Sequence, residues 1–317
     1  MPFLEGTSAL LNFFSDIREN FYQEAMKFGQ VDDPGSVDFT LPEDHPDTSR
    51  VLAKYKNDKA PFEVFVGCAK WNRTDLKGFY PRGTKDELSY YSTQFNSIEL
   101  NATFYRSPSK SQVITWASKT PEGFKFFPKI PQPVSHFRRL QDVKQPVEEF
   151  CDAISGFEEK LGMTFLQMPD NFHPRYLDRV EAFVQNFPKE IPLAVEVRHE
   201  DWFGKPDIAD ALHKILSQHH SSHVIVDTAG RRDMLHMRLT NDTAFIRYVG
   251  ANAPSDYSRL DDWVERIKVW RSLGLQKLYF FVHQNVELES PLLSAHFIKN
   301  LNEALGLSLK IPKTLDQ

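Results

Sequence analysis

The chain has 317 residues, of which 41% are hydrophobic and 26% charged, so it is expected to be a soluble globular protein. No apolar run approaches the roughly 18–20 residues that a membrane span needs. The first cationic side chain is Arg18, so no secretory signal is expected. Two cysteines, Cys68 and Cys151, are too few for a disulfide framework and indicate a cytoplasmic protein with reduced thiols. The net charge of −5 argues against a non-specific nucleic-acid binder, because such proteins usually carry a basic surface.

The first 60 residues (1–60) differ in character from the rest and are predicted to form an N-terminal helical extension. Ser8 is a candidate helix cap. The apolar stripe that follows at helical spacing consists of Leu10, Phe13, Phe14, Ile17, Phe21, Ala25 and Phe28. We expect this helix to pack on the main domain, with a partner or dimer contact as the alternative. A membrane-surface helix is disfavoured because acidic residues dominate its polar face. Residues 31–61 are rich in Asp, Pro, Gly and Ser and are predicted to be an extended connector.

Residues 61–317 alternate between predicted strands and helices and form the predicted main domain. Strands are expected at 62–69, 97–103, 124–130, 163–168, 193–199, 223–227, 244–249 and 278–284. Helices are expected at 85–95, 109–119, 146–160, 174–187, 206–219, 260–273 and 291–305, with a shorter element at 231–239. This alternation is typical of an α/β protein with a (β/α)8 TIM-like barrel, and a doubly wound open sheet is the competing architecture. The GCAKWN segment after the first strand is neither a dinucleotide-binding nor a P-loop motif, which disfavours both kinds of site.

Polar side chains recur on one face of the predicted strands. In the stretch FNSIELNATFYRSP at 95–108, Ile98 and Leu100 alternate with Glu99 and Asn101. Because buried carboxylates and amides are costly without partners, the recurrence indicates a functional mouth at the C-terminal ends of the strands. The strand residues assigned to this mouth are Glu99, Asn101, Lys129, Gln167, Glu196, Arg198, Asp227, Arg247 and His283. The alternative is a network of salt bridges that only fills the barrel.

Aromatic and histidine side chains in the loops after the strands are predicted to surround the same mouth. They are Trp71, Phe104, Tyr105, His136, Trp202 and Tyr257. Rings around a charged pocket suit stacking against a sugar or a base, whereas ordinary loop packing explains each ring taken alone.

Seven sequence blocks, in this order, resemble the domain-of-unknown-function 72 family, also called YecE-like. The blocks are GCAKWN with GFYP, SIELNATFYRSP, KIPQPVSH, LQMPDNF, VEVRHEDW, FIRYVG and FFVHQN. The resemblance covers about residues 62–300 and implies a TIM-barrel-like fold, but it implies little about activity. The recurrent polar positions of the family correspond to Glu99, Asn101, Phe104, Tyr105, Lys129, His136, Gln167, Pro169, Glu196, Arg198, Trp202, Asp227, Arg247 and Gly250. The chain departs from the family at Val249, where members often have His, and in the last strand, which ends in HQN rather than an Asn-rich run.

The residue types favour acid–base chemistry on a small phosphorylated or carboxylated, sugar-like substrate. Arginine holds such anions with a bidentate fork, and a carboxylate paired with histidine can move protons. The predicted catalytic residues are Glu99, His136, Glu196, Asp227 and His283. The predicted substrate-binding residues are Trp71, Asn101, Phe104, Tyr105, Lys129, Gln167, Arg198, Trp202, Arg247 and Tyr257. A carboxylate beside two arginines has a lowered pKa, so the acid farthest from the arginines is the better candidate for the general base.

Two other functions remain open from the sequence. One is a divalent-metal-dependent isomerase or hydrolase, although the nearby cationic side chains would compete with the ion and no cofactor is predicted. Its candidate ligands are Glu99, Glu196, Asp227 and His283. The other is a nucleic-acid-binding or nuclease-like barrel, with backbone phosphate on Lys129, Arg198 and Arg247 and bases on the aromatic rings. The net charge of −5 disfavours this second alternative.

Overall fold

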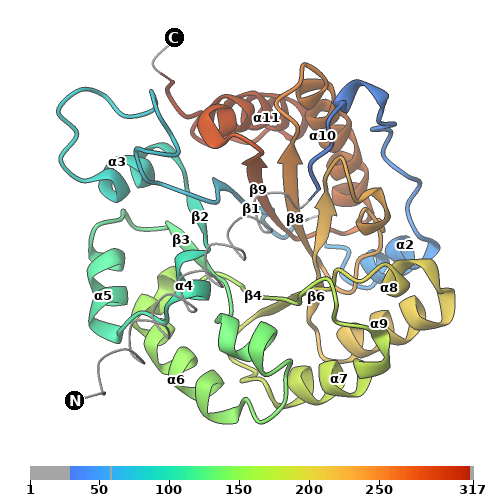
Figure 1. The fold of residues 1–317 in the computed structure, drawn as a ribbon. Helices are drawn as coiled ribbons and strands as arrows, with labels where there is room; N and C mark the ends of the chain where they lie inside the picture. The colour runs from blue at the N-terminus through green and yellow to red at the C-terminus, as the bar shows by residue number, and fades with distance from the viewer. Residues whose placement is uncertain (1–28, 58, 315–317) are drawn as a thin grey trace, which may run out of the picture.

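The computed structural model describes residues 29–57 and 59–314 of the chain. The predicted apolar helix over residues 8–28 lies outside these ranges. Figure 1 shows the strands at the centre of the molecule and most of the helices around them. Within the described residues, no helix combines the length and the apolar character that crossing a bilayer requires.

A strand forms in each region where the sequence predicts one. The strands are β1 Glu63–Cys68, β2 Ser97–Leu100, β3 Lys125–Pro128, β4 Thr164–Gln167, β5 Leu193–Glu196, β6 Ser222–His223, β7 Ile225–Asp227, β8 Thr243–Gly250 and β9 Lys277–Gln284. The sixth predicted strand is split into β6 and β7, which flank Val224. All the paired strands are parallel, which is the arrangement expected when helices connect successive strands. The predicted α/β class with parallel sheets is therefore confirmed.

The strands pair in three sheets rather than in one continuous sheet. Their orders are β1-β9-β8-β7, β2-β3 and β4-β5-β6. Isolated bridges between Phe126 and Leu161 and between Lys129 and Phe165 connect the second sheet to the third. The Asn96 side chain links β1 to the start of β2, because its amide donates to the Val64 carbonyl at 2.8 Å and accepts from the Val66 N–H at 2.9 Å.

The helices follow the predicted alternation with the strands. They are α2 Pro46–Ala53, α3 Glu87–Gln94, α4 Ala102–Tyr105, α5 Lys110–Ser118, α6 Lys144–Ile154, α7 Leu177–Asn186, α8 Asp201–Gly204, α9 Pro206–Gln218, α10 Ser255–Leu273 and α11 Ser290–Leu305. Side-chain caps explain several of their first residues: Asp86 accepts from the Ser89 N–H before α3, and Ser109 accepts from the Gln112 N–H before α5. The short element predicted at 231–239 is reduced to a single 3-10 turn, Arg232–Met234.

The predicted extended connector at 31–61 contains a helix, α2, that the sequence analysis missed. Pro46 occupies its first turn, and the His45 side chain accepts from the Asp47 N–H as its N-cap. The helix is stabilised by tertiary contacts: Val51 and Leu52 are buried, and the hydroxyl of Thr48 donates to the Met237 carbonyl at 2.9 Å. Eight residues carry too little periodicity to reveal such a helix in advance, because its stability comes from packing.

The predicted strand 97–103 ends earlier, at Leu100, and the chain turns at once into α4. The Thr103 hydroxyl contacts the carbonyl oxygens of Leu100 and Lys129 at 2.9 and 2.7 Å, which holds the turn against the end of β3. This turn places Asn101, Phe104 and the neighbouring tyrosine beside the C-terminal ends of the strands.

The interior has an aromatic layer below a polar layer. The aromatic layer consists of Phe127, Phe165, Phe245, Tyr279 and Phe281, whose rings contact one another at centroid distances of 4.7–6.2 Å. Two residues further along the same strands, and therefore on the same face, lie Lys129, Gln167, Arg247 and His283. The apolar layer thus closes the interior beneath the polar side chains.

Candidate functional site

The guanidinium of Arg247, on β8, lies at the centre of the polar layer. It contacts both oxygens of Glu99, with Nε–Oε2 and Nη2–Oε1 distances of 2.9 Å. Its Nη1 donates to Glu196 Oε2 at 2.7 Å, and Glu196 Oε1 accepts from Arg198 Nε at 2.6 Å. Both carboxylates are fully buried. Three of the four side chains come from β2, β5 and β8, and Arg198 follows the end of β5, so the fold brings together groups almost 150 residues apart in the sequence.

One neutral oxygen, Gln167 Oε1 at the end of β4, accepts hydrogen bonds from three cationic groups. Arg198 Nη2 lies 2.8 Å from it, Lys129 Nζ 3.1 Å and Arg247 Nη1 3.3 Å. A carbonyl oxygen has two lone pairs, so three charged donors exceed what it can satisfy. The cations thus converge on a point that offers them little negative charge.

The carboxylates of this cluster are held ionised. Burial alone would raise the pKa of Glu99, but Arg247 and His283 outweigh it and lower that pKa well below its usual value. Burial also opposes ionisation of Glu196, and Arg247 and Arg198 reverse the effect, so its pKa is lowered as well. With Arg198 and Arg247 charged, the two acids are neutralised, and a protonated Lys129 leaves the cluster with one excess positive charge.

Lys129 occupies an environment that disfavours its ammonium form. Its Nζ lies 4.0 Å from the centre of the Phe104 ring, a cation–π contact that favours the charged form. Among the described residues, Gln167 alone accepts a hydrogen bond from this Nζ. Burial, followed by repulsion from Arg247 and Arg198, lowers the pKa of Lys129 to about 7. The lysine is therefore poised to exchange a proton near neutral pH.

A second acid–base group stands at the end of β9. His283 Nε2 lies 3.0 Å from Glu99 Oε2, and its Nδ1 lies 3.9 Å from Glu287 Oε1. Burial raises the pKa of Glu287, while Ser290 donates to its carboxylate at 2.6 Å. Glu287 is not among the residues predicted from the sequence, although it lies only four residues after the predicted His283. The histidine thus lies between a carboxylate with a lowered pKa and one with a raised pKa.

A cavity of about 530 Å³ opens above this polar layer. Among the predicted site residues, those that line it are Trp71, Asn101, Tyr105, Lys129, Gln167, Arg198, Arg247 and His283. Lys70, Asp75 and Glu287 also line it and were not predicted. Another hollow of similar volume, about 520 Å³, is lined mainly by apolar groups such as Phe95 and Ile298 and lacks a cluster of this kind.

The structure places Asp227 outside this cluster. Its carboxylate accepts from Arg259 Nη2 at 2.7 Å and Trp263 Nε1 at 2.8 Å, both on α10, and from Arg232. The preceding residue, Val226, lines the cavity instead. Alternation along a strand predicts that neighbouring side chains face opposite sides, but it does not say which side is the interior. On β7 the prediction was therefore wrong: Val226 faces the cavity and Asp227 faces α10.

Six further predicted residues do not line the cavity. Glu99 and Glu196 are buried beneath it and Phe104 packs on Lys129, and the other three lie farther from the cluster. The Trp202 indole is buried and donates to the Phe172 carbonyl at 2.8 Å. Tyr257, on α10, packs edge-on against His296. His136 contacts the Phe104 ring at 4.9 Å behind Lys129, and burial together with the Lys129 charge lowers the pKa of His136 to about 3. His136 thus supports the site from behind as a neutral ring.

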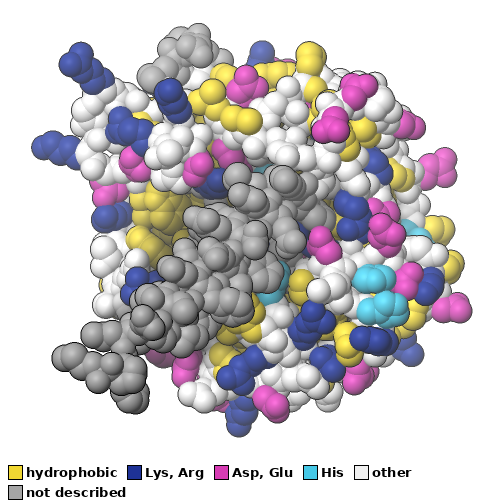
Figure 2. All heavy atoms as spheres, viewed as in Figure 1, with side chains coloured by type: hydrophobic (Ala, Val, Ile, Leu, Met, Phe, Trp, Pro, Cys, Tyr) yellow, Lys and Arg dark blue, Asp and Glu magenta, His cyan; other side chains and the backbone are white. Residues whose placement is uncertain are grey.

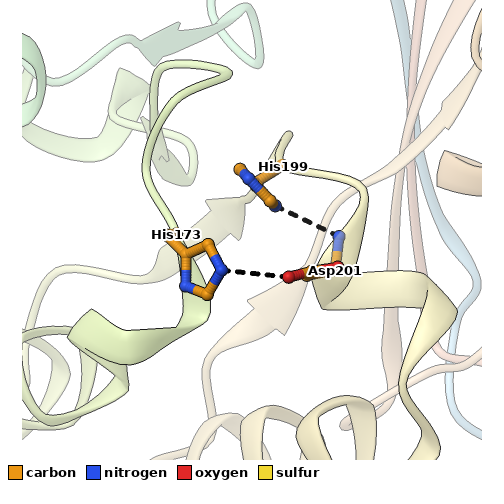
Figure 3. Close-up of side chains that lie close together, drawn as sticks. All are labelled: His173, His199 and Asp201. Carbon is orange, nitrogen blue, oxygen red and sulfur yellow. Dashed lines mark hydrogen bonds and ion pairs between the residues drawn. The ribbon is translucent and has the colours of Figure 1, made fainter.

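Among the described residues, two groups combine histidine and carboxylate atoms at metal-binding spacing: His173 with His199 and Asp201, and His45 with Asp47 and Asp210. Figure 3 shows the first group, in which His173 Nε2 lies 3.0 Å from the Asp201 carboxylate and His199 Nδ1 accepts from the Asp201 N–H. In the same way, His173 Nδ1 accepts from the Arg175 N–H, and His45 Nδ1 accepts from the Asp47 N–H. A neutral imidazole that accepts through Nδ1 carries its proton on Nε2, which removes the lone pair an ion would need. His173 and His45 are the N-caps of the helical turns that follow them.

On the face shown in Figure 2, lysine and arginine side chains are interspersed with aspartate and glutamate. A protein that follows a nucleic-acid backbone usually gathers its basic groups in one stripe or patch. The visible charges on this face are therefore mixed rather than gathered in a basic stripe.

Comparisons with known proteins agree with this architecture. The family model described as "Protein of unknown function DUF72" matches residues 65–315. The UPF0759 protein YecE of Escherichia coli (strain K12) is 26% identical over 264 residues, which cover 76% of this chain and 94% of that protein. The UPF0759 protein YunF of Bacillus subtilis (strain 168) is 28% identical over 156 residues, which cover 45% of this chain and 53% of that protein. The crystal structure of a DUF72 family protein (EF0366) from Enterococcus faecalis V583 superposes with a TM-score of 0.61 at 18% identity, covering 78% of this chain and 99% of that one. With both the sequence and the fold in agreement, the chain belongs to the DUF72 family.

Proposed function

We propose that the chain binds a small phosphorylated or carboxylated, sugar-like molecule in the cavity above Arg247 and acts on it by acid–base chemistry. The observation that carries the proposal is the convergence of Lys129, Arg198 and Arg247 on the single neutral oxygen of Gln167. An anionic oxygen beside Gln167 would give these donors the negative charge that the amide lacks. Charge-assisted hydrogen bonds of this kind are shorter and roughly twice as strong as neutral ones.

The acid–base roles follow from the different surroundings of the two carboxyl groups, which shift the pKa of Glu99 down and that of Glu287 up. Glu99 is held ionised by Arg247, so it orients His283 and makes a poor proton acceptor. Glu287 has a raised pKa and lines the cavity, so it is the group that can donate a proton to a bound substrate. His283, between the two, accepts or returns the second proton.

We further propose that the three sheets are parts of one closed TIM-like (β/α)8 barrel. The bridges between β3 and β4, the Asn96 side chain between β1 and β2, and the continuity of β6 with β7 all support closure. In such a barrel the C-terminal ends of the strands carry the active site, which is where the polar layer lies.

The proposal is tested by thermal shift on the purified chain with inorganic phosphate, ribose 5-phosphate, pyruvate and a short single-stranded oligonucleotide, each with and without Mn²⁺. A ligand at 100 times its dissociation constant adds roughly 2.7 kcal/mol to the free energy of unfolding, which raises the melting temperature by a few degrees. We expect a shift with at least one small anion. A shift with the oligonucleotide alone, lost in salt, would favour a nucleic-acid binder, and strict dependence on Mn²⁺ would favour a metal enzyme.

The matched variants are Arg198→Met at the cavity and Lys144→Met on the exposed face of α6. Lys144 is 89% exposed and its ion pair with Glu148 is long, at 3.9 Å. Lys160 is unsuitable as a surface control, because its ammonium donates to main-chain carbonyls at 2.6 and 2.8 Å. We expect Arg198→Met to abolish the anion-dependent shift and Lys144→Met to preserve it. Equal shifts in both variants would overturn the assignment of the site.

A further inference from the structure

Lys129 differs from the other cationic residues of the cavity in having no carboxylate partner among the residues that the structure describes. Arg198 and Arg247 both form ion pairs with Glu196, whereas no described carboxylate forms one with the Lys129 ammonium. Its side chain is 7% exposed and its Nζ lies against the Phe104 ring at the floor of the cavity. An arginine at this position would bind an anion equally well, so anion binding alone does not account for a lysine whose charged form is disfavoured.

We propose that Lys129 is a nucleophile that forms a Schiff base with a carbonyl group of the bound molecule, which makes the substrate class an anionic aldehyde, ketose or 2-oxo acid. This inference rests on the proposed function, because Arg198 and Arg247 are the groups that would hold the anionic end. Lysines that serve as Schiff-base nucleophiles are typically desolvated or placed beside another cation. Lys129 meets both conditions, since burial and the two guanidiniums lower its pKa to about 7.

The covalent step balances without an added oxidant or reductant. The neutral amine of Lys129 attacks the carbonyl carbon, the C–O π bond breaks, and a carbinolamine forms after proton transfer from nitrogen to oxygen. Protonation of the carbinolamine hydroxyl lets it leave as water while the nitrogen lone pair forms the C=N bond, which gives the iminium ion directly, with the one remaining N–H proton kept on nitrogen. The acid that protonates the leaving hydroxyl is Glu287, which lines the same cavity and has a raised pKa. The iminium then withdraws electrons from the neighbouring carbon, which is the position from which His283 would remove a proton.

Groups from every neighbouring element act on the Lys129 amine. Repulsion comes from Arg247 on β8 and from Arg198 after β5, and attraction comes from Glu196 and Glu99. The remaining contacts are neutral: Gln167 on β4, the Phe104 ring on α4, and His136 behind that ring. Because the guanidiniums are paired with the acids, burial is the largest effect on the lysine, and it brings the pKa to about 7, where amine and ammonium are both present at neutral pH.

The experiment is reductive trapping. The purified wild-type chain is incubated with pyruvate and sodium cyanoborohydride, then digested and mapped by mass spectrometry. The expected product is a single modified peptide at Lys129 whose mass rises by that of pyruvate less one oxygen atom. At pH 7 we expect modification of Lys129 to be on the order of 1,000-fold faster than that of the exposed Lys144, because about half of an amine with a pKa of about 7 is neutral, against roughly 1 part in 2,500 of an ordinary lysine with a pKa near 10.4. The rate at Lys129 should rise through about pH 7 and then level off.

Two controls separate this inference from the proposed function. Acetone offers the same carbonyl without the anion, and inorganic phosphate should compete with pyruvate but not with acetone.

The variants test the position of the adduct. Lys129→Met should lose the adduct and Lys144→Met should keep it. If Lys129→Met does not fold, peptide mapping of the wild type identifies the modified lysine. Anion binding by calorimetry without any adduct at Lys129 would overturn the nucleophile and leave the anion site standing. Trapping of Lys129 by acetone and pyruvate at equal rates, with no anion binding, would support the nucleophile and overturn the proposed function.

Discussion

Arg247 and Glu99 form a buried bidentate pair, with both nitrogen–oxygen distances at 2.9 Å, although 148 residues separate them in the chain. Arg247→Met would leave Glu99 and Glu196 as adjacent buried carboxylates. Breaking one side of a buried ion pair costs about 3–5 kcal/mol. We therefore expect a loss of that size in the free energy of unfolding, measured by urea denaturation followed by circular dichroism.

The double variant Glu99→Gln with Arg247→Met provides the matched test of this pair. It removes one of the two carboxylates that the single variant leaves without a partner, so its loss of stability should be smaller than the sum of the two single losses. Lys144→Met should change the free energy of unfolding by less than about 0.5 kcal/mol, as expected for an exposed side chain. Strict additivity would contradict the coupling of Arg247 with Glu99.

Asp227 is expected to stabilise the fold without contributing to ligand binding. Its carboxylate accepts from Arg259 and Trp263 of α10 and is fully buried outside the cavity. Asp227→Asn should lower the free energy of unfolding by about 3 kcal/mol, because it removes a buried carboxylate that pairs with both Arg259 and Arg232 and leaves Arg259 with Asp256 alone. The affinity for inorganic phosphate, measured by calorimetry, should stay unchanged. A tenfold loss of affinity with unchanged stability would instead return Asp227 to the site.

Glu287 should make the stability of the chain depend on pH in a defined direction. Burial raises its pKa in the folded protein above the unfolded value of about 4.3. Between the unfolded pKa and the raised folded pKa, the folded state binds more protons than the unfolded state, so the free energy of unfolding falls as the pH rises across that interval. Glu287→Gln removes the ionisable group and should be more stable than the wild type at pH 8, with the difference shrinking toward pH 4. Glu303→Gln, on an exposed position of α11, should show no such trend, and a difference that grows toward acid pH would contradict the prediction.

The order and type of the main elements were accessible from the sequence because they depend on local periodicity. Apolar runs such as FEVFVGCA and AFIRYV, separated by helical patterns, predicted the strands β1 and β8 and the parallel α/β class. Alternation on the strands also predicted that Lys129, Gln167, Arg247 and His283 face the cavity, because every second side chain of a strand shares a face. The helix α2 escaped prediction, because its stability comes from contacts with residues far away in the chain.

Tertiary structure alone decided how the polar residues divide into groups. The sequence placed Asp227, Glu99 and Glu196 in one mouth, but the partners on α10 hold Asp227 apart, while Arg247 joins the two glutamates. The sequence also could not show that no described carboxylate forms an ion pair with Lys129, or that Glu287 lines the cavity. Residue types and spacing report which side chains share a strand face, which is a local property. The charge that each group carries depends on burial and on neighbours from other strands, and only the packed fold sets those distances.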